Sequence, residues 1–333
     1  MKLLTRLGVI VLLAALTLSA CESIGIALGL RTRLDKVPVT ALSASLVPDP
    51  GLAPGKKAKL ILVASTADGK TLTTVGAGKG PVLFDSFIFQ PTIVQVKDGV
   101  VSMPADPRVS EGQTPHLQIA VVGHPEVTTD LEVPPRYDAA FKAHFSGATG
   151  TPGIDGLAGL DGSAGASGSI DLNNPSPGGN GDDGSRGGDG GNGGPGGNAQ
   201  SVKVAMTLRA GAPQLIEVRV SAGARQQYYL IDPDGGSLSV DANGGAGGRA
   251  GNGGRGGRGG SGGSGFPGGL PGTDGPNGSD GFAGPPGLAG TISVTVDPAA
   301  QAYLGVLHLS NHNGNGSAGP AQQVQVQPVA ALW

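Results

Sequence analysis

Residues 147–168 read GATGTPGIDGLAGLDGSAGASG, with glycine at every third position. A second stretch with this period, 178–198, reads GGNGDDGSRGGDGGNGGPGGN. A third stretch keeps one register from Gly245 to Gly290, where fifteen of sixteen third positions are glycine and Phe266 is the exception. Glycine at a period of three indicates an extended left-handed helix with three residues per turn.

The third stretch divides near 266–271, where Phe266, Pro267 and Pro271 indicate a turn. Four glycine tracts result: 147–170, 178–198, 244–265 and about 272–290. Each would span roughly 60–75 Å at about 3.1 Å per residue. The two middle tracts have a second glycine row. If every close neighbour needs one glycine row, we expect a row of tracts with the doubled ones at its centre.

These tracts resemble the polyglycine II bundles of a springtail antifreeze protein and of phage tail-tip adhesins. The resemblance implies single helices packed side by side, whose glycine rows let the backbones approach through N–H···O and weak Cα–H···O bonds. A collagen-like triple helix has the same period, but 147–170 contains only Pro152 and collagen has no use for a doubled row. A flexible glycine linker is the alternative that composition alone suggests.

The sequence on either side of the tracts predicts a mainly β protein. Turn residues such as Asp68-Gly69 and Asp98-Gly99 separate short β-rich segments between 38 and 140. The expected strands are 39–46, 58–65, 82–89, 92–96, 116–122 and 128–133. Six or seven short strands in about 100 residues resemble an immunoglobulin-like β-sandwich.

The segments 199–243 and 291–333 predict the two halves of one small antiparallel β unit. Apolar residues alternate in 202–208 and 216–220, and two further strands are expected at 227–231 and 238–240. TISVTV at 291–296 is similar to SVKVAM at 201–206, and 304–310 is similar to 215–221. A unit of glycine tracts followed by a strand pair therefore occurs twice, and we expect its strands to cap the bundle.

The beginning of the chain has the pattern of a secretory signal. Residues 1–20 contain a basic start and an apolar stretch, and 18–21 read LSAC. This tetrapeptide resembles the bacterial lipobox, which implies cleavage before Cys21, lipidation of that cysteine and a tether over 21–37. The residue after the cysteine is Glu22 and not the aspartate typical of inner-membrane retention, so the resemblance implies an outer-membrane lipoprotein. An ordinary signal peptide with an unmodified cysteine is the alternative.

The composition excludes several classes of protein. Glycine accounts for 63 of 333 residues, aromatic residues for 4% and charged residues for 14%. Large apolar residues are too few for one globular core along the whole chain, and charge is too sparse for a coiled coil or a nucleic-acid binder. A single cysteine excludes a disulfide framework.

The sequence therefore favours a non-enzymatic lipoprotein with a structural or adhesive role at the cell surface. It has no motif for a metal, a cofactor or a nucleophilic catalyst. The alternative is a module that binds a glycan or a protein through Tyr228, Tyr229 and Tyr303, with glycine as its spacer. The order of lipobox, β domain and glycine tracts resembles uncharacterised collagen-like, glycine-rich lipoproteins of predatory soil bacteria.

Overall fold

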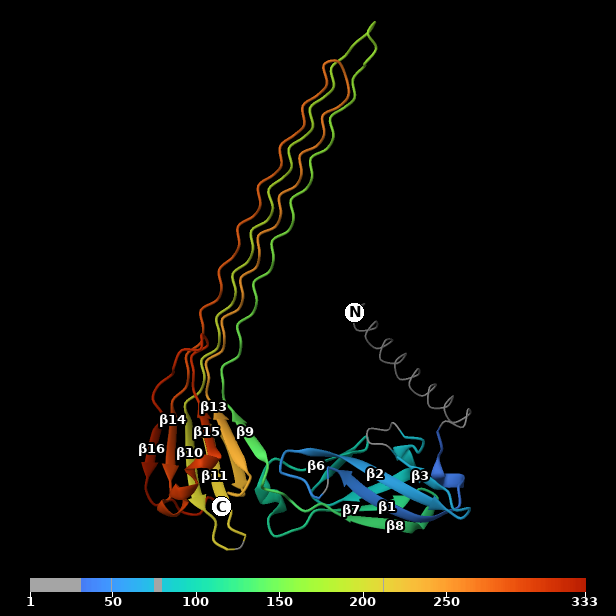
Figure 1. The fold of residues 1–333 in the computed structure, drawn as a ribbon, viewed down its shortest axis with the longest axis vertical. Helices are drawn as coiled ribbons and strands as arrows, with labels where there is room; N and C mark the ends of the chain where they lie inside the picture. Colours follow the sequence, from blue (N-terminus) through green and yellow to red (C-terminus); the bar gives the residue numbers. More distant parts are fainter. Residues whose placement is uncertain (1–30, 49, 75–79, 212) are drawn as a thin grey trace, which may run out of the picture.

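The computed structural model describes residues 31–48, 50–74, 80–211 and 213–333. Two β domains lie next to each other, and a long stalk made of the four glycine tracts rises from one of them (Figure 1). We call this one the base domain (strands β9–β16) and the other the N-terminal domain (strands β1–β8). The predicted signal peptide lies outside the described residues.

The N-terminal domain has two sheets around a shared core. One sheet has the order β1-β2-β6-β5, with β3 also paired to β2, and the other has the order β4-β7-β8. Both contribute apolar side chains to one buried cluster, including Leu60 and Leu62 from the first and Leu117 and Ile119 from the second. The strands are β1 (Val39–Val47), β2 (Lys57–Thr66), β3 (Thr71–Thr73), β4 (Phe87–Pro91), β5 (Gln95–Lys97), β6 (Val100–Ser102), β7 (His116–Val121) and β8 (His124–Glu132).

Most of the strands expected in this domain are present, and both expected hairpins form. Asp98 and Gly99 have positive φ in the turn between β5 and β6, a conformation that asparagine, aspartate and glycine tolerate best. The expected strand at 82–89 begins only at Phe87, because the short 3-10 helix η2 (Phe84–Ser86) precedes it. The immunoglobulin-like assignment remains a prediction.

The base domain also has two sheets. The larger has the order β12-β11-β10-β14-β16, and the smaller has the order β15-β13-β9. Their facing side chains share one buried cluster, with Val204 and Val218 from the larger sheet and Phe141 and Val240 from the smaller. The strands are β9 (Ala140–His144), β10 (Val202–Leu208), β11 (Ile216–Ala222), β12 (Arg225–Ile231), β13 (Ser237–Asp241), β14 (Ile292–Val296), β15 (Leu307–Ser310) and β16 (Gln323–Val326).

The expectation of an antiparallel β unit is wrong for four of the six strand pairings of the base domain, since only β10–β11 and β11–β12 are antiparallel. The pairs β10–β14, β14–β16, β13–β15 and β13–β9 are all parallel. The similar segments 201–206 and 291–296 do pair, since Val202 is opposite Ile292. The second match fails, because 304–306 lies in the 3-10 helix η4 (Pro298–Val306) and β15 belongs to a different sheet from β11.

Four glycine tracts form the stalk, and backbone hydrogen bonds connect them over their whole length (Figure 1). We call them tract 1 (147–170), tract 2 (178–198), tract 3 (244–265) and tract 4 (268–290). The N–H groups of glycines three residues apart donate to carbonyl oxygens of a neighbouring tract at 2.6–3.0 Å. Tracts 1 and 3 run parallel to each other and antiparallel to tracts 2 and 4.

The stalk and the base domain share one hydrogen-bond register. Gly147 N–H donates to Asn243 O, 96 positions away, and Phe145 N–H donates to Asp241 O with the same separation. The number of positions between hydrogen-bonded residues of tracts 2 and 4 likewise stays the same where these tracts continue into β10 and β14. The strands are parallel because β9 and β13 lead into parallel tracts, and β10 and β14 leave parallel tracts.

The four tracts pack in a two-by-two arrangement, in which tracts 2 and 3 contact each other across the diagonal. The expected linear row is therefore wrong. Tracts 2 and 3 each hydrogen-bond to three others, whereas tracts 1 and 4 each bond to two. Five pairs of tracts are therefore neighbours. The rule of one glycine row per neighbour fails too, because tract 1 has a single row and two neighbours.

One glycine face for each neighbouring pair accounts for the pattern, and Ala250 is the single interruption among these faces, in the row of tract 3 toward tract 4. A Cβ on tract 1 would overlap carbonyl oxygens of tract 2, and one on the first row of tract 2 would overlap those of tract 3. The two rows of tract 3 face tracts 4 and 1, and the row of tract 4 faces tract 2. The second row of tract 2 is looser, since a Cβ on Gly188 would lie 3.1 Å from Leu157 N. Asp182 and Ser185 interrupt only this row.

Adjacent glycines of tract 2 provide a matched test. We expect Gly187→Ala to lower the free energy of unfolding by about 1–3 kcal/mol, because its methyl would overlap the Gly254 carbonyl oxygen. Gly188→Ala should change it by less than about 1 kcal/mol. Guanidinium denaturation and amide hydrogen exchange across the stalk measure both. Equal effects of the two substitutions would contradict the assignment of rows.

Candidate functional site

The stalk has a row of asparagine and aspartate side chains that completes its backbone hydrogen bonding. This row lies on tract 2, and its side-chain oxygens accept N–H groups of tract 4 at 2.6–2.9 Å. Each acceptor is 90 positions from its donor. The pairs are Asn180 with Leu270, Asp183 with Thr273, Asp189 with Ser279, Asn192 with Phe282, and Asn198 with Leu288.

The two interruptions of this row coincide with prolines on tract 4. At the same separation of 90, Arg186 corresponds to Pro276 and Pro195 corresponds to Pro285. Proline has no N–H to donate, so no acceptor is needed at either position. The sequence therefore encodes the pairing of tracts 2 and 4 residue by residue.

Other polar side chains accept backbone N–H groups of tract 3 in the same way. Asp274, Asn277 and Asp280 of tract 4 accept N–H groups of glycines in tract 3 at 2.7–2.9 Å. Asp155 and Asp161 of tract 1 accept N–H groups of tract 3. The spacing of three between such side chains is visible in the sequence, but their role as acceptors is not.

The carboxylate of Asp183 has its pKa lowered from the ordinary value of 3.8, first by the backbone N–H of Thr273 and then by the Thr273 hydroxyl. Both donors favour the ionised form. The Asp183 contribution to stability is therefore present above the ordinary aspartate pKa and is lost as the pH falls through the lowered value.

Removal of one acceptor should loosen one connection of the stalk. We expect Asn192→Ala to lower the free energy of unfolding by about 1 kcal/mol and to speed hydrogen exchange at the Phe282 amide. Arg186→Ala is the matched control, because it is opposite Pro276 and removes only an exposed ion pair with Asp189. If Arg186→Ala destabilises the chain as much, the acceptor row does not stabilise the stalk.

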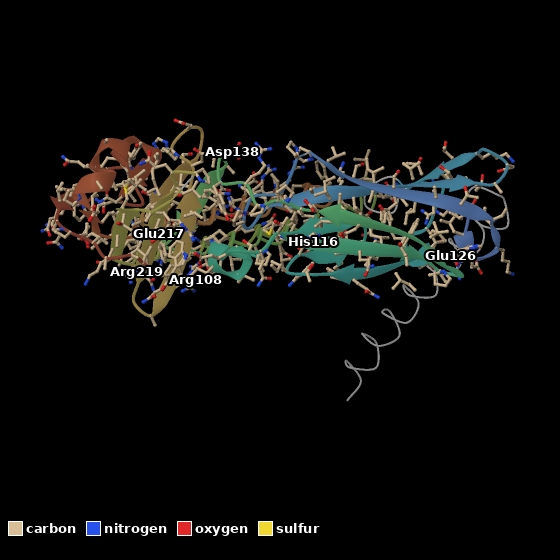
Figure 2. The ribbon with its side chains drawn as sticks, turned by 90° about the horizontal axis from the view of Figure 1, so that it is seen from below. Arg108, His116, Glu126, Asp138, Glu217 and Arg219 are labelled. Carbon is tan, nitrogen blue, oxygen red and sulfur yellow. The ribbon has the colours of Figure 1, made fainter. Side chains whose placement is uncertain are left out.

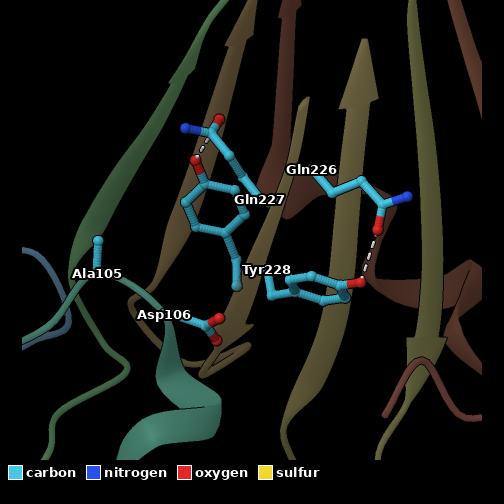
Figure 3. Close-up of a pocket in the computed structure, with 6 residues that line it drawn as sticks. Ala105, Asp106, Gln226, Gln227 and Tyr228 are labelled. Atoms are coloured by element: carbon cyan, nitrogen blue, oxygen red, sulfur yellow. Dashed lines mark hydrogen bonds between the residues drawn. The ribbon is translucent and has the colours of Figure 1, made fainter. Parts of the chain in front are cut away.

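A hollow between the two β domains is the second candidate site. It has a volume of about 170 Å³ and is lined by Ala105, Asp106, Gln226, Gln227, Tyr228 and Tyr229 (Figure 3). The first two residues precede the 3-10 helix η3 (Pro107–Ser110) of the N-terminal domain, and the other four lie on the edge strand β12. Figure 2 shows Arg108 where the two domains meet.

Tyr228 is held by aromatic and cationic neighbours. The Arg108 guanidinium carbon lies 3.6 Å from the centre of its ring, and the Trp333 ring meets it edge-on at 5.6 Å. Its hydroxyl donates to Gln226 Oε1 at 2.8 Å. Arg108 also donates to both carboxylate oxygens of Asp106, which lowers the pKa of that carboxyl group. The cation–π contact therefore joins the N-terminal domain to the base domain.

Tyr229 points to the opposite face of β12, into the core of the base domain. Its ring packs against Phe141 with the ring centres 6.0 Å apart, and its hydroxyl lies 3.1 Å from the Lys142 carbonyl oxygen. Burial raises the pKa of Tyr229 to about 12. Its phenol group has mainly a structural role, although part of it borders the hollow.

Tyr303 does not line this hollow. It lies in η4, and its hydroxyl donates to Gln214 Oε1 at 3.1 Å. The hollow therefore combines two of the three predicted tyrosines with amide groups and a carboxylate that no sequence pattern singles out. Cys21, the predicted lipidation site, lies outside the described residues.

Within the described ranges, His, Cys, Asp and Glu side chains form no group of three or more suited to a metal ion. Over the same part of the chain, none of the helices has the length and apolar character needed to span a bilayer. Comparisons with family models, curated proteins and solved structures gave no match for this chain.

Tyr229 provides a test of the packing beside the hollow. Because its folded-state pKa of about 12 exceeds the ordinary value of 10.0, its contribution to stability is full below pH 10 and is lost as the pH rises toward 12. We expect this alkaline loss, followed by denaturation at several pH values, to be smaller in Tyr229→Phe. Ultraviolet titration should show a phenol ionisation near pH 12 that this variant lacks. Its presence in the variant would contradict the assignment.

Proposed function

We propose that the protein is a non-enzymatic, outer-membrane-anchored lipoprotein with a structural or adhesive role at the cell surface. The LSAC sequence ending at Cys21 supports the anchor. The observation that carries the mechanical role is the stalk, in which backbone hydrogen bonds in one register continue into the base domain. We infer that its tracts are polyglycine II helices, because glycine recurs every three residues and each row faces a neighbouring backbone.

A stalk of this kind is rigid without a hydrophobic core, so it holds its far end at a set distance from the base domain. Each tract is bonded to at least two others, so bending it would stretch many hydrogen bonds at once. About 20 residues at about 3.1 Å per residue hold its far end roughly 60 Å from the base domain. The proposed role is to present that end, or to space the cell surface from its surroundings.

The hollow beside Tyr228 supports the second candidate function, binding of a glycan or protein. It offers the amide groups of Gln226 and Gln227, the Asp106 carboxylate and an aromatic ring. Such groups suit a hydroxylated ligand about the size of one sugar ring. If the glycine tracts act only as a spacer for this site, deletion of residues 147–198 should leave binding unchanged.

Acyl labelling and cell fractionation test the anchor. In cells given a labelled fatty acid, we expect the chain to carry the label and to be recovered with the outer membrane. Cys21→Ser should remove the label and release the chain from that fraction, because the acyl chains supply the membrane affinity. Protease treatment of intact cells then reports exposure at the surface. Membrane recovery without label would contradict lipidation at Cys21.

A further inference from the structure

The far end of the stalk exposes four large apolar side chains. The exposed fractions are 74% for Ile170, 86% for Leu172, 66% for Phe266 and 68% for Leu270. We call these four residues the tip. Ile170 and Leu172 lie at the turn between tracts 1 and 2, and Phe266 lies at the turn between tracts 3 and 4. This end is remote from both β domains (Figure 1).

Hydrogen bonds bring the two turns together. Phe266 N–H donates to Ser176 O at 3.0 Å, and Gly181 N–H donates to Leu270 O at 2.9 Å. The tip therefore gathers protruding apolar groups from the two turns and from the adjoining start of tract 4, which are distant in sequence. Folding leaves these groups in water, although burial of such side chains is favourable.

The first turn satisfies part of its own polar backbone, through five of its N–H groups. Ser176 and Asn174 N–H groups donate to the carbonyl oxygens of Ser169 and Asp171, and Asp171 N–H donates to the Ser169 hydroxyl. The Asn173 and Ser169 N–H groups donate to side chains of the same turn. Transfer to an apolar medium is costly for backbone groups without partners, so these bonds suit the turn for such a medium.

The tip is also almost free of charge. Asp171 is the one charged residue within 162–181, and 259–273 has none. Toward the base domain, the stalk again carries Asp182, Asp183, Asp274 and Arg258. A protein partner is usually selected by complementary charges around an apolar centre. The end of the stalk instead presents protruding apolar side chains with one charge beside them, at the exposed Asp171, and a fluid bilayer accommodates such an end without a matching pocket.

We propose that the tip inserts into the interfacial region of a lipid bilayer. This inference deepens the proposed adhesive function and rests on it, because it makes the target of adhesion a lipid surface. Insertion places Ile170, Leu172, Phe266 and Leu270 among the acyl chains, while the hydrogen-bonded stalk stays in water. Binding then depends on apolar area and hardly at all on anionic lipid or ionic strength.

Vesicle flotation tests the proposal with the mature chain carrying Cys21→Ser, so that no acyl anchor contributes. The vesicles are pure phosphatidylcholine. Replacement of all four tip residues by serine should reduce the bound fraction at least tenfold. A second variant, with only Leu172→Ser and Phe266→Ser, should give an intermediate reduction. Addition of phosphatidylglycerol should leave binding unchanged. Addition of 0.5 M salt, which shortens the Debye length to about 4 Å and so screens charge interactions, should also leave it unchanged.

The stalk offers a matched control. Ile154, Leu157 and Leu160 of tract 1 are as exposed as the tip residues, at 83%, 83% and 78%. They lie about 30–50 Å back along the stalk at about 3.1 Å per residue. Their joint replacement by serine should change vesicle binding less than twofold. Circular dichroism and amide exchange of all variants should match the parent chain.

Any of three results would overturn the proposal. The first is that the parent chain fails to float with phosphatidylcholine vesicles, including the case where it binds only vesicles containing outer-membrane proteins. The second is that the control loses binding as strongly as the tip variant, which would mean that the stalk lies flat on the bilayer. The third is that binding requires anionic lipid. Acyl labelling at Cys21 is measured separately in cells, so failure of the anchor and failure of the tip are distinguishable.

Discussion

The backbone hydrogen bond between a glycine N–H and the carbonyl oxygen of a neighbouring tract determines the rest of this structure. It forms only where no Cβ separates the two backbones, as the overlap of a Cβ on Gly187 with the Gly254 carbonyl illustrates. Because the donors repeat every three residues, one correct pairing determines all others in the same two tracts. The stalk then needs no hydrophobic core, which accounts for the low aromatic content of the chain.

The base domain inherits its topology from this bonding. Tracts 1 and 3 are parallel, so β9 and β13, which lead into them, pair in parallel; the same holds for β10 and β14. The core of the base domain supplies the hydrophobic stabilisation that the stalk lacks. Register set in either part is therefore transmitted to the other, and the asparagine and aspartate row on tract 2 makes that register specific.

The tip and the hollow differ in what they can recognise. The hollow near Tyr228 is concave and polar, and its aromatic ring already has Arg108 and Trp333 as neighbours. The tip is protruding, apolar and without such neighbours among the described residues. A lipoprotein anchored at Cys21 and carrying this tip would have lipid-directed groups at two separate places, with a stalk and two β domains between them.

The sequence by itself determined the tracts, their lengths, the doubled rows of the middle two and most of the strands. These follow from local rules, since glycine period and apolar alternation are properties of short segments. It did not determine strand direction, the two-by-two packing, or the use of Asn192 and Asp183 as acceptors. Those depend on which segments become neighbours, and the partners of Asp183 and Asn192 lie 90 positions away along the chain. Only the tertiary structure brings such partners together, because each tract must find a glycine face that leaves room for its backbone.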